Sequence, residues 1–286
     1  MSHIHDDKVK KLEIIATNIR KDIIKMLFEA GSGHPAGSLG MADVFTALYF
    51  QIMHHKPKNP DWKGRDRLIL SNGHICPVRY AAMAYAGYFP KKELMTLRKF
   101  GTRLQGHPER MRLPGLESTS GPLGAGLAQA AGLAYAAKMD GMRWRTYAVT
   151  SDGEHGAGPH WEAVLFAGKH RLANLTNIID RNNIQIDGRT EDVMPLEPLR
   201  KKYESFNWHV IEVDGNDVRQ IIEAVNIAKA ITEKPTAIIA HNIPGRGVSF
   251  MEGDFRWHGK TPNADETDRA LEELRALGDR LRSDHE

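Results

Sequence analysis

The sequence predicts an α/β protein built around a mostly parallel β-sheet. Short apolar runs typical of strands alternate with helical patterns along the whole chain. The clearest unit spans residues 146–188, where two strand-like runs flank one helical stretch, as in a βαβ unit. No internal repeat or low-complexity linker interrupts the chain, so we predict a single domain over residues 1–286.

The N-terminal part predicts helices around one strand. Residues 7–30 carry Leu12, Ile19 and Ile23 on one apolar face, and Gly31 ends this helix. The following elements are predicted, in order, as a loop over 31–38, a helix over 41–53, a strand over 67–70, and helices over 78–85 and 91–100.

The remainder continues the same alternation. Alanine and glycine dominate residues 127–139, so this helix is expected to pack closely against its neighbours. Asp217 is a predicted N-cap for a helix ending near residue 231. The other predictions are strands over 147–149, 177–179, 208–213 and 236–240, helices over 162–172 and 266–282, and loop-rich segments over 189–202 and 244–262.

Composition excludes several classes of protein. The 286 residues are 41% hydrophobic and 26% charged, and the formal net charge is +3. Without a dense basic stripe we expect no nucleic-acid partner. No apolar run approaches the roughly 20 residues of a membrane span, and the N-terminus lacks a signal-peptide core, so we expect a cytoplasmic protein with no membrane association. Cys76 is the single cysteine, which fits a reducing compartment.

Two polar residues follow neighbouring predicted strands of the βαβ unit. Asp152 and Asn182 are expected at the same edge of the sheet, because the carboxyl ends of parallel strands meet there. A carboxylate and an amide oxygen suit a hard cation such as Mg²⁺ bridging to a diphosphate. The alternative, a turn aspartate and a capping asparagine, stays open on spacing alone. Asp214, in a second Asp-Gly pair, is interpreted as a turn residue.

Histidines beside glycines form the second feature. His34, His74, His107 and His258 each lie in a glycine-containing loop, where backbone and imidazole can approach a ligand closely. Each is also compatible with an ordinary loop histidine, and their spacing is not that of a zinc site. Residues 121–126 are glycine-rich before a helix, which favours either anion binding or tight packing. Neither a P-loop nor a serine-hydrolase motif is present.

The chain resembles the N-terminal half of transketolases. SDG followed about thirty residues later by NN is similar to the thiamine diphosphate motif. Further blocks match in order over nearly the whole chain: SGHPAGSLGMAD, DRLILSNGH, GHPE, LPGLESTSGPLGAG, WEAVLFAGKHRLANL, DRNNIQIDG and GVSFMEGDFRWHGKTPN. The resemblance implies a three-layer α/β/α fold that binds thiamine diphosphate.

The resemblance also implies roles for individual residues. Asp152, Asn182 and the carbonyl of Ile184 would hold Mg²⁺ or another divalent cation. The cofactor would be contacted by His74, Gly121, Leu123, Gly153, Asn182 and His258. His34, His74, His107 and His258 would act on the substrate as acid–base and hydrogen-bonding groups.

Only the first of three transketolase domains is represented, so the resemblance implies the N-terminal subunit of a split enzyme. A C-terminal subunit would supply the pyrimidine-binding domain and its activating glutamate, in an α2β2 complex acting on sugars or sugar phosphates. The chain alone is therefore expected to be inactive. Glu162 matches an interface position. Two departures are Ser151, in place of the first glycine of GDG, and Ala157, in place of an interface glutamate.

Other functions are also compatible with the sequence, some with the same cofactor and one without it. One is the α-type subunit of a 2-oxo acid dehydrogenase, although the SGHP, SNGH and GHPE blocks argue against it. A deoxyxylulose phosphate synthase is normally one long chain. The loop at Ala157 is unusual and is compatible with a subfamily acting on a ketose other than the pentose phosphates. A non-catalytic regulatory subunit is the alternative from another class.

Overall fold

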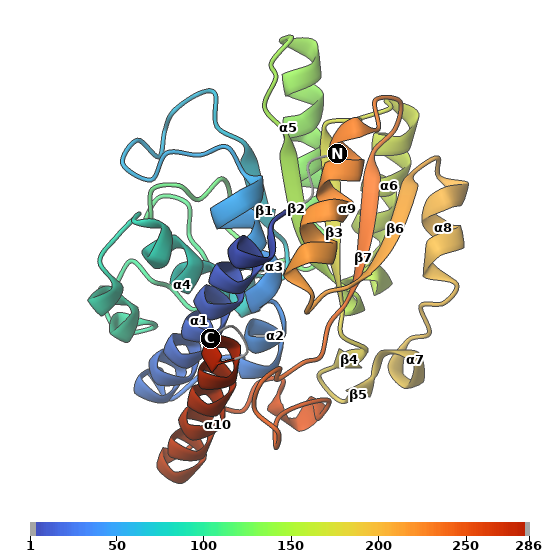
Figure 1. Cartoon of the computed structure of the whole chain (residues 1–286). Helices are drawn as coiled ribbons and strands as arrows, with labels where there is room; N and C mark the ends of the chain where they lie inside the picture. Colours follow the sequence, from blue (N-terminus) through green and yellow to red (C-terminus); the bar gives the residue numbers. More distant parts are fainter. Residues whose placement is uncertain (1–3, 284–286) are drawn as a thin grey trace.

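The computed structural model describes residues 4–283 and contains a five-stranded, fully parallel sheet (Figure 1). The order across the sheet is β1-β2-β3-β7-β6. The strands are β1 (Arg67–Leu70), β2 (Thr146–Ser151), β3 (Leu175–Arg181), β6 (His209–Asp214) and β7 (Thr236–His241). The predicted α/β class with a mostly parallel sheet is confirmed.

Two layers of helices cover the sheet, one on each face. Alternate residues of a strand point to opposite faces, so buried strands such as β2 present apolar side chains on both faces. Tyr147 and Val149 belong to one hydrophobic core, whereas Ala148 between them belongs to the other. The first face is covered by α1 (Asp6–Ala30), α2 (Pro35–Gly40), α3 (Ala42–Ala47), α4 (Cys76–Ala86) and α9 (Val218–Ala230). The second is covered by α5 (Gly126–Met139), α6 (Gly158–Lys169) and α8 (Leu199–Ser205). The fold therefore has three layers.

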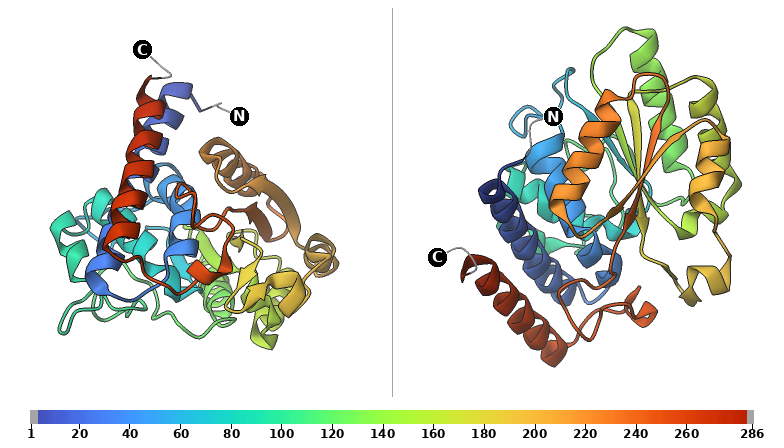
Figure 2. Two further views of the ribbon diagram at one scale, coloured as in Figure 1. Left: turned by 90° about the horizontal axis from the view of Figure 1, so that it is seen from below. Right: turned by 45° about the vertical axis from the view of Figure 1, so that its right-hand side comes forward.

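The last helix, α10 (Ala264–Ser283), lies along α1 on the outside of the first layer (Figures 1 and 2). Leu271 and Leu274 of α10 join the first core. The N-cap predicted for α9 is confirmed, since the Asp217 carboxylate accepts hydrogen bonds from the amides of Arg219 and Gln220. Among residues 4–283, no helix has the length and apolar character needed to cross a membrane.

Short elements differ from the prediction. Residues 35–40 form α2 instead of a loop, because Pro35 stands in the first turn, where its fixed φ suits a helix. The predicted helix over 41–53 consists of α3 followed by a π-helical turn, Leu48–Ile52. The predicted helix over 91–100 is a 3₁₀ segment, Lys91–Thr96. Further 3₁₀ turns are Gly73–Ile75, Gly153–Gly156 and Phe255–Trp257.

Short strands and helices also occur just before and within the segment predicted as loop over 189–202. β4 (Ile184–Gln185) pairs with β5 (Gly188–Arg189) in an antiparallel hairpin, and α7 (Thr190–Val193) follows it directly. α8 then starts at residue 199, and α6 starts four residues before its predicted beginning. Elements this short contain too few residues for apolar periodicity to distinguish them from loops.

Candidate functional site

The carboxyl ends of β2 and β3 place Asp152 and Asn182 at one edge of the sheet. The two strands are neighbours, and Ser151 is in register with Asp180. The amide of Asp152 donates a 3.1 Å hydrogen bond to the carbonyl of Asp180, so the chain turns immediately beyond this pair. The juxtaposition predicted from the βαβ spacing is therefore present.

The Asp152 carboxylate is held by a set of hydrogen-bond donors. Its Oδ2 accepts from Arg181 Nη1 at 3.1 Å, from the Asn183 amide at 2.8 Å and from Thr190 Oγ1 at 3.2 Å. Its Oδ1 accepts from the Gly153 amide at 2.7 Å. Burial raises the pKa of Asp152, and the charge of Arg181 opposes that rise. The side chain is therefore fixed in orientation.

Asn182 and Ile184 complete a set of oxygen donors. Asn182 Nδ2 donates to Asp180 Oδ2 at 2.9 Å, which orients the amide oxygen Oδ1 toward the Ile184 amide, 3.0 Å away. Asn183 adopts a left-handed backbone conformation, φ 62°, and so turns the chain into β4, where the Ile184 carbonyl lies. Within residues 4–283 no cluster of three His, Cys, Asp or Glu side chains forms a metal site. A mixed carboxylate, amide and carbonyl set fits a hard cation such as Mg²⁺ and not a soft one.

Arg181 connects this aspartate to the following segment. It is buried, and its Nη2 donates to Glu191 Oε1 at 2.7 Å and to Glu197 Oε1 at 3.0 Å. Both glutamates lie on the segment 190–197, which includes α7. The arginine thus ties the position of Asp152 to that of α7. Sequence reasoning missed it, although an arginine at the end of a buried strand was a visible signal.

Glu154 links three loops around the site. Its Oε1 accepts from the Ser151 amide at 2.8 Å, while its Oε2 accepts from Ser71 Oγ at 2.5 Å and the Gly124 amide at 2.7 Å. Burial raises the pKa of Glu154, and these donors oppose the rise. This buried carboxylate was also missed. It ties the predicted glycine-rich loop before α5 to the turn that carries Asp152.

Three of the four predicted histidines form one group. The ring centroids of His34, His74 and His258 are 5.0 to 5.4 Å apart in every pairing. His107 lies next to Gly73, the residue that precedes His74: a Cβ built on Gly73 would be 3.1 Å from the His107 ring. Four loops that are distant in the sequence therefore converge on one place.

The pKa of each of these histidines is lowered, which favours the neutral imidazole near pH 7. Burial lowers the pKa of His34 to about 4, with the charges of His258 and Arg98 adding to the effect. Burial also lowers the pKa of His74 well below its usual value, and it lowers the pKa of His107 and of His258. A neutral imidazole has one nitrogen that accepts and one that donates a hydrogen bond. The group can therefore accept protons from hydroxyls and donate hydrogen bonds to oxygens.

The histidine group and the oxygen donors share this edge of the molecule. His34 precedes α2, and a Cβ on Gly37 of that helix would lie 3.9 Å from Asp180 Oδ2. Gly121 lies against His107, at 3.7 Å by the same measure, with a positive φ of 143°. Leu123 is 47% exposed, so it presents an apolar side chain at the surface.

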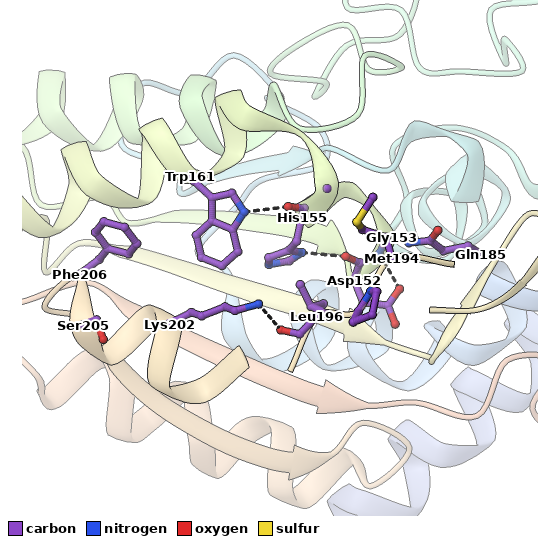
Figure 3. A pocket seen from close by; sticks show the side chains of 12 residues that line it. Asp152, Gly153, His155, Trp161, Gln185, Met194, Leu196, Lys202, Ser205 and Phe206 are labelled. Atoms are coloured by element: carbon purple, nitrogen blue, oxygen red, sulfur yellow. Dashed lines mark hydrogen bonds between the residues drawn. The ribbon is translucent and has the colours of Figure 1, made fainter. Parts of the chain in front are cut away.

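A pocket of about 530 Å³ reaches Asp152 and Gly153 from the side of α6 and α8 (Figure 3). Trp161 and Phe206 form apolar walls, and Lys202 donates to the Leu196 carbonyl at 2.7 Å. None of the four predicted histidines lines this pocket. Asp152 is thus bordered by a cavity on the side of α6 and α8, away from the four histidines.

A buried hydrogen-bond network adjoins this pocket and begins at His155, which lines it. His155 Nδ1 lies 2.9 Å from the Ser151 carbonyl and so carries the proton, which leaves Nε2 to accept from Tyr203 Oη at 2.9 Å. Tyr203 Oη then accepts from His160 Nε2 at 2.7 Å and from Asn177 Nδ2 at 3.1 Å. These bonds define both tautomers and hold α6 against α8. The loop around Ala157 is unusual in sequence, but no local pattern predicts this network.

Comparisons with known proteins show which family the chain resembles. The chain matches the family described as transketolase, thiamine diphosphate binding domain, over residues 12–277. It is 42% identical over 263 residues to the 6-deoxy-6-sulfo-D-fructose transketolase subunit SqwG of Clostridium sp. (strain MSTE9), covering 92% of this chain and 96% of that protein. It is 38% identical to one of the subunits of the apulose-4-phosphate transketolase of Phocaeicola vulgatus, covering 93% and 95%.

Longer proteins match over part of their length. The chain is 36% identical to the transketolase of Rattus norvegicus, covering 93% of this chain and 42% of the relative. Among solved structures, the transketolase of Campylobacter jejuni superposes with a TM-score of 0.87 at 31% identity, over 94% of this chain and 45% of that one.

Proposed function

Because the chain belongs to the transketolase family, whose thiamine diphosphate-binding domain it matches over residues 12–277, we propose that it is the N-terminal subunit of a two-chain transketolase. Such a transferase moves a two-carbon ketol unit from a ketose to an aldose. The observation that carries the proposal is the pairing of Asp152 and Asn182 at adjacent strand ends, in a chain of the same extent as relatives named as transketolase subunits.

In this proposal the cofactor and its metal lie at the edge of the sheet. Asp152, Asn182 and the Ile184 carbonyl hold Mg²⁺, and the Gly153 amide binds the diphosphate. Gly121, Leu123, His74 and His258 are the other proposed contacts. Bound thiamine diphosphate supplies the carbon nucleophile for breaking and making the carbon–carbon bond.

The histidine group supplies proton transfer. His34, His107 and His258, together with His74, bind the hydroxyls of the sugar and carry protons to and from the alkoxides that arise as the bond breaks. Their lowered pKa keeps them neutral at pH 7, so each can accept a proton from a hydroxyl.

The partner is a C-terminal subunit that carries the pyrimidine-binding domain. We propose that residues 1–286 form one domain, that two copies of each chain assemble, and that the complex is cytoplasmic. The relatives are named for a sulfo-sugar and for a branched sugar phosphate, so the ketose need not be a pentose phosphate. The 2-oxo acid dehydrogenase and non-catalytic alternatives are not favoured, because these relatives are named as transketolase subunits.

The test uses the chain together with its partner subunit. Calorimetry with thiamine diphosphate and Mg²⁺ should detect binding, and Asp152→Ala should abolish it. Asp214→Ala is the matched control, because Asp214 also precedes a glycine at a strand end but lies at the far edge strand, β6. Equal affinity in the two variants would refute the metal site, and turnover by this chain alone would refute the need for a partner.

A further inference from the structure

Asn242 lies at the end of β7, the strand next to β3 in the sheet. The residue is 5% exposed. Its Nδ2 donates to Asp180 Oδ1 at 2.8 Å, to the Ala240 carbonyl at 3.1 Å and to Met41 Sδ at 3.2 Å. All three partners accept hydrogen bonds, so they fix which end of the Asn242 amide faces Asp180.

Asp180 connects Asn242 to the proposed metal ligand Asn182. Asp180 is 1% exposed, and its second oxygen, Oδ2, accepts from Asn182 Nδ2 at 2.9 Å. Each oxygen of this carboxylate therefore receives one amide N–H, from Asn242 on one side and from Asn182 on the other. Because the nitrogen of the Asn182 amide is held by Asp180, its oxygen is the group left to bind a cation.

The orientation of the Asn182 amide depends on these hydrogen bonds and not on its shape. The oxygen and the NH₂ group of an asparagine are nearly equal in size, so packing hardly opposes a turn of the amide by 180°. A turned amide would present N–H groups to the cation, and these cannot bind it. The bond to Asp180 prevents this turn.

Gly215 leaves the space that the Asn242 side chain occupies. A Cβ built on Gly215 would lie 2.0 Å from Asn242 Oδ1 and 2.6 Å from its Cγ. Gly215 directly follows β6, and its amide donates to the His241 carbonyl at 2.9 Å, which holds its backbone against β7. The glycine of the second Asp-Gly pair therefore has a packing role beyond forming a turn. The ends of three neighbouring strands, β6, β7 and β3, are linked in this way.

We propose that Asn242 is a positioning residue for the divalent cation. Through Asp180 it orients the Asn182 amide so that the oxygen faces the cation. The inference rests on the proposed function, because it requires the metal site at Asp152 and Asn182. Replacing residues that hydrogen-bond to metal ligands typically weakens metal binding by about 10–100-fold.

The test measures binding of Mn²⁺ to the two-chain complex in the presence of thiamine diphosphate. After bound metal is removed with a chelator, Mn²⁺ is added and free Mn²⁺ is quantified by electron paramagnetic resonance, which requires no turnover. Asn242→Leu should raise the Kd for Mn²⁺ about tenfold or more, because leucine has a similar volume but donates no hydrogen bond. Asn242→Ser keeps a donor and should lose less affinity. The Mg²⁺ concentration for half-maximal ketol transfer should rise in parallel, with kcat at saturating Mg²⁺ near that of the wild type.

Gly215→Ala tests the same contact without changing a hydrogen-bonding side chain. The added Cβ should displace the Asn242 side chain and so raise the Kd for Mn²⁺ as well. Asn242→Ala removes the atoms that this Cβ would strike, so adding Gly215→Ala to it should cause little further loss. Losses that add in the double variant would overturn the proposed link.

Asn216→Leu is the matched control for a purely structural effect. Asn216 Nδ2 also donates to a buried carboxylate, Asp43 Oδ2, at 3.2 Å, and to the Gly40 carbonyl at 2.9 Å. These bonds lead to α2 and α3 and away from Asn182. Asn216→Leu should therefore lower the midpoint of urea unfolding and leave the Kd for Mn²⁺ unchanged. Equal weakening of Mn²⁺ binding in Asn216→Leu and Asn242→Leu would overturn the positioning role.

The remaining outcomes separate this inference from the proposed function. A wild-type complex that binds no Mn²⁺ with thiamine diphosphate refutes the proposed metal site itself. A wild type that binds Mn²⁺, with the same Kd in Asn242→Leu and Gly215→Ala, overturns only the role of Asn242. If Asn242→Leu does not fold, the Kd values of Asn242→Ser and Gly215→Ala decide the question by the same criterion.

Discussion

Arg181 donates a 3.1 Å hydrogen bond to Asp152 Oδ2, and both side chains are almost fully buried. The same guanidinium bonds Glu191 and Glu197, so one cation joins the proposed metal ligand to the segment around α7. Buried charges are tolerated only when they are paired and hydrogen-bonded. The proposed metal site is thus oriented by an ion-pair network inside the chain.

Arg181→Met should destabilise the chain by roughly 2–4 kcal/mol, because it leaves Asp152 buried without its counter-charge. Urea denaturation at pH 7.5 measures the difference. Arg200→Met is the matched control, since Arg200 also bonds two glutamates, Glu204 and Glu212, but at the surface. We expect a loss of under about 1 kcal/mol there. Equal losses in the two variants would contradict the structural role assigned to Arg181.

Glu154→Gln should destabilise the chain by about 1–3 kcal/mol. Three donors, from Ser71, Gly124 and Ser151, point at the two carboxylate oxygens, and a glutamine must turn its amide N–H₂ toward one of them. Thermal unfolding monitored by circular dichroism would report the loss. Glu272→Gln, at an exposed position of α10, provides a surface comparison. A Glu154→Gln protein as stable as the wild type would mean that these donors contribute little.

Stability should fall as the pH decreases from about 6.5. Burial lowers the pKa of His160 well below its usual value, so the unfolded chain takes up a proton that the folded chain refuses. The neutral His160 contributes fully to the free energy of unfolding above the pKa that histidine has in the unfolded chain. Below that pKa this contribution falls by roughly 1.4 kcal/mol per pH unit. His155 and Tyr203 face this ring, and no carboxylate bonds to it among residues 4–283. His160→Asn should flatten the slope of stability against pH between about 6.5 and 5; an unchanged slope would contradict this assignment.

Two helical glycines should respond oppositely to alanine. A Cβ on Gly168 of α6 would lie 1.9 Å from the Phe206 carbonyl oxygen, so Gly168→Ala should destabilise by about 3 kcal/mol or more. A Cβ on Gly132 of α5 meets nothing within 4 Å, so Gly132→Ala should stabilise by about 0.5–1 kcal/mol. The midpoints of urea unfolding of both variants, compared with the wild type, measure these changes in stability. A neutral Gly168→Ala would show that α6 can move away from α8.

The long elements and the strand ends of the proposed site were predictable from the sequence. Asp152 and Asn182 follow apolar runs that flank a helical pattern, and parallel pairing necessarily brings such ends together. The short elements were not predictable. Pro35 begins a buried helix of six residues, where the sequence pattern of glycine and proline predicted a loop. Six residues contain fewer than two helical turns, so apolar periodicity provides no signal.

The sequence by itself determined the α/β class, the residues at the strand ends and the four histidine loops, because these depend on local patterns and motifs. Only the tertiary structure decided which distant groups meet. Arg181 reached Asp152, and Glu154 joined Ser71 to Gly124. The rings of His34, His74 and His258 came together from three separate loops. The physical reason is that such pairings depend on the packing of separate loops against the sheet, which no local pattern encodes.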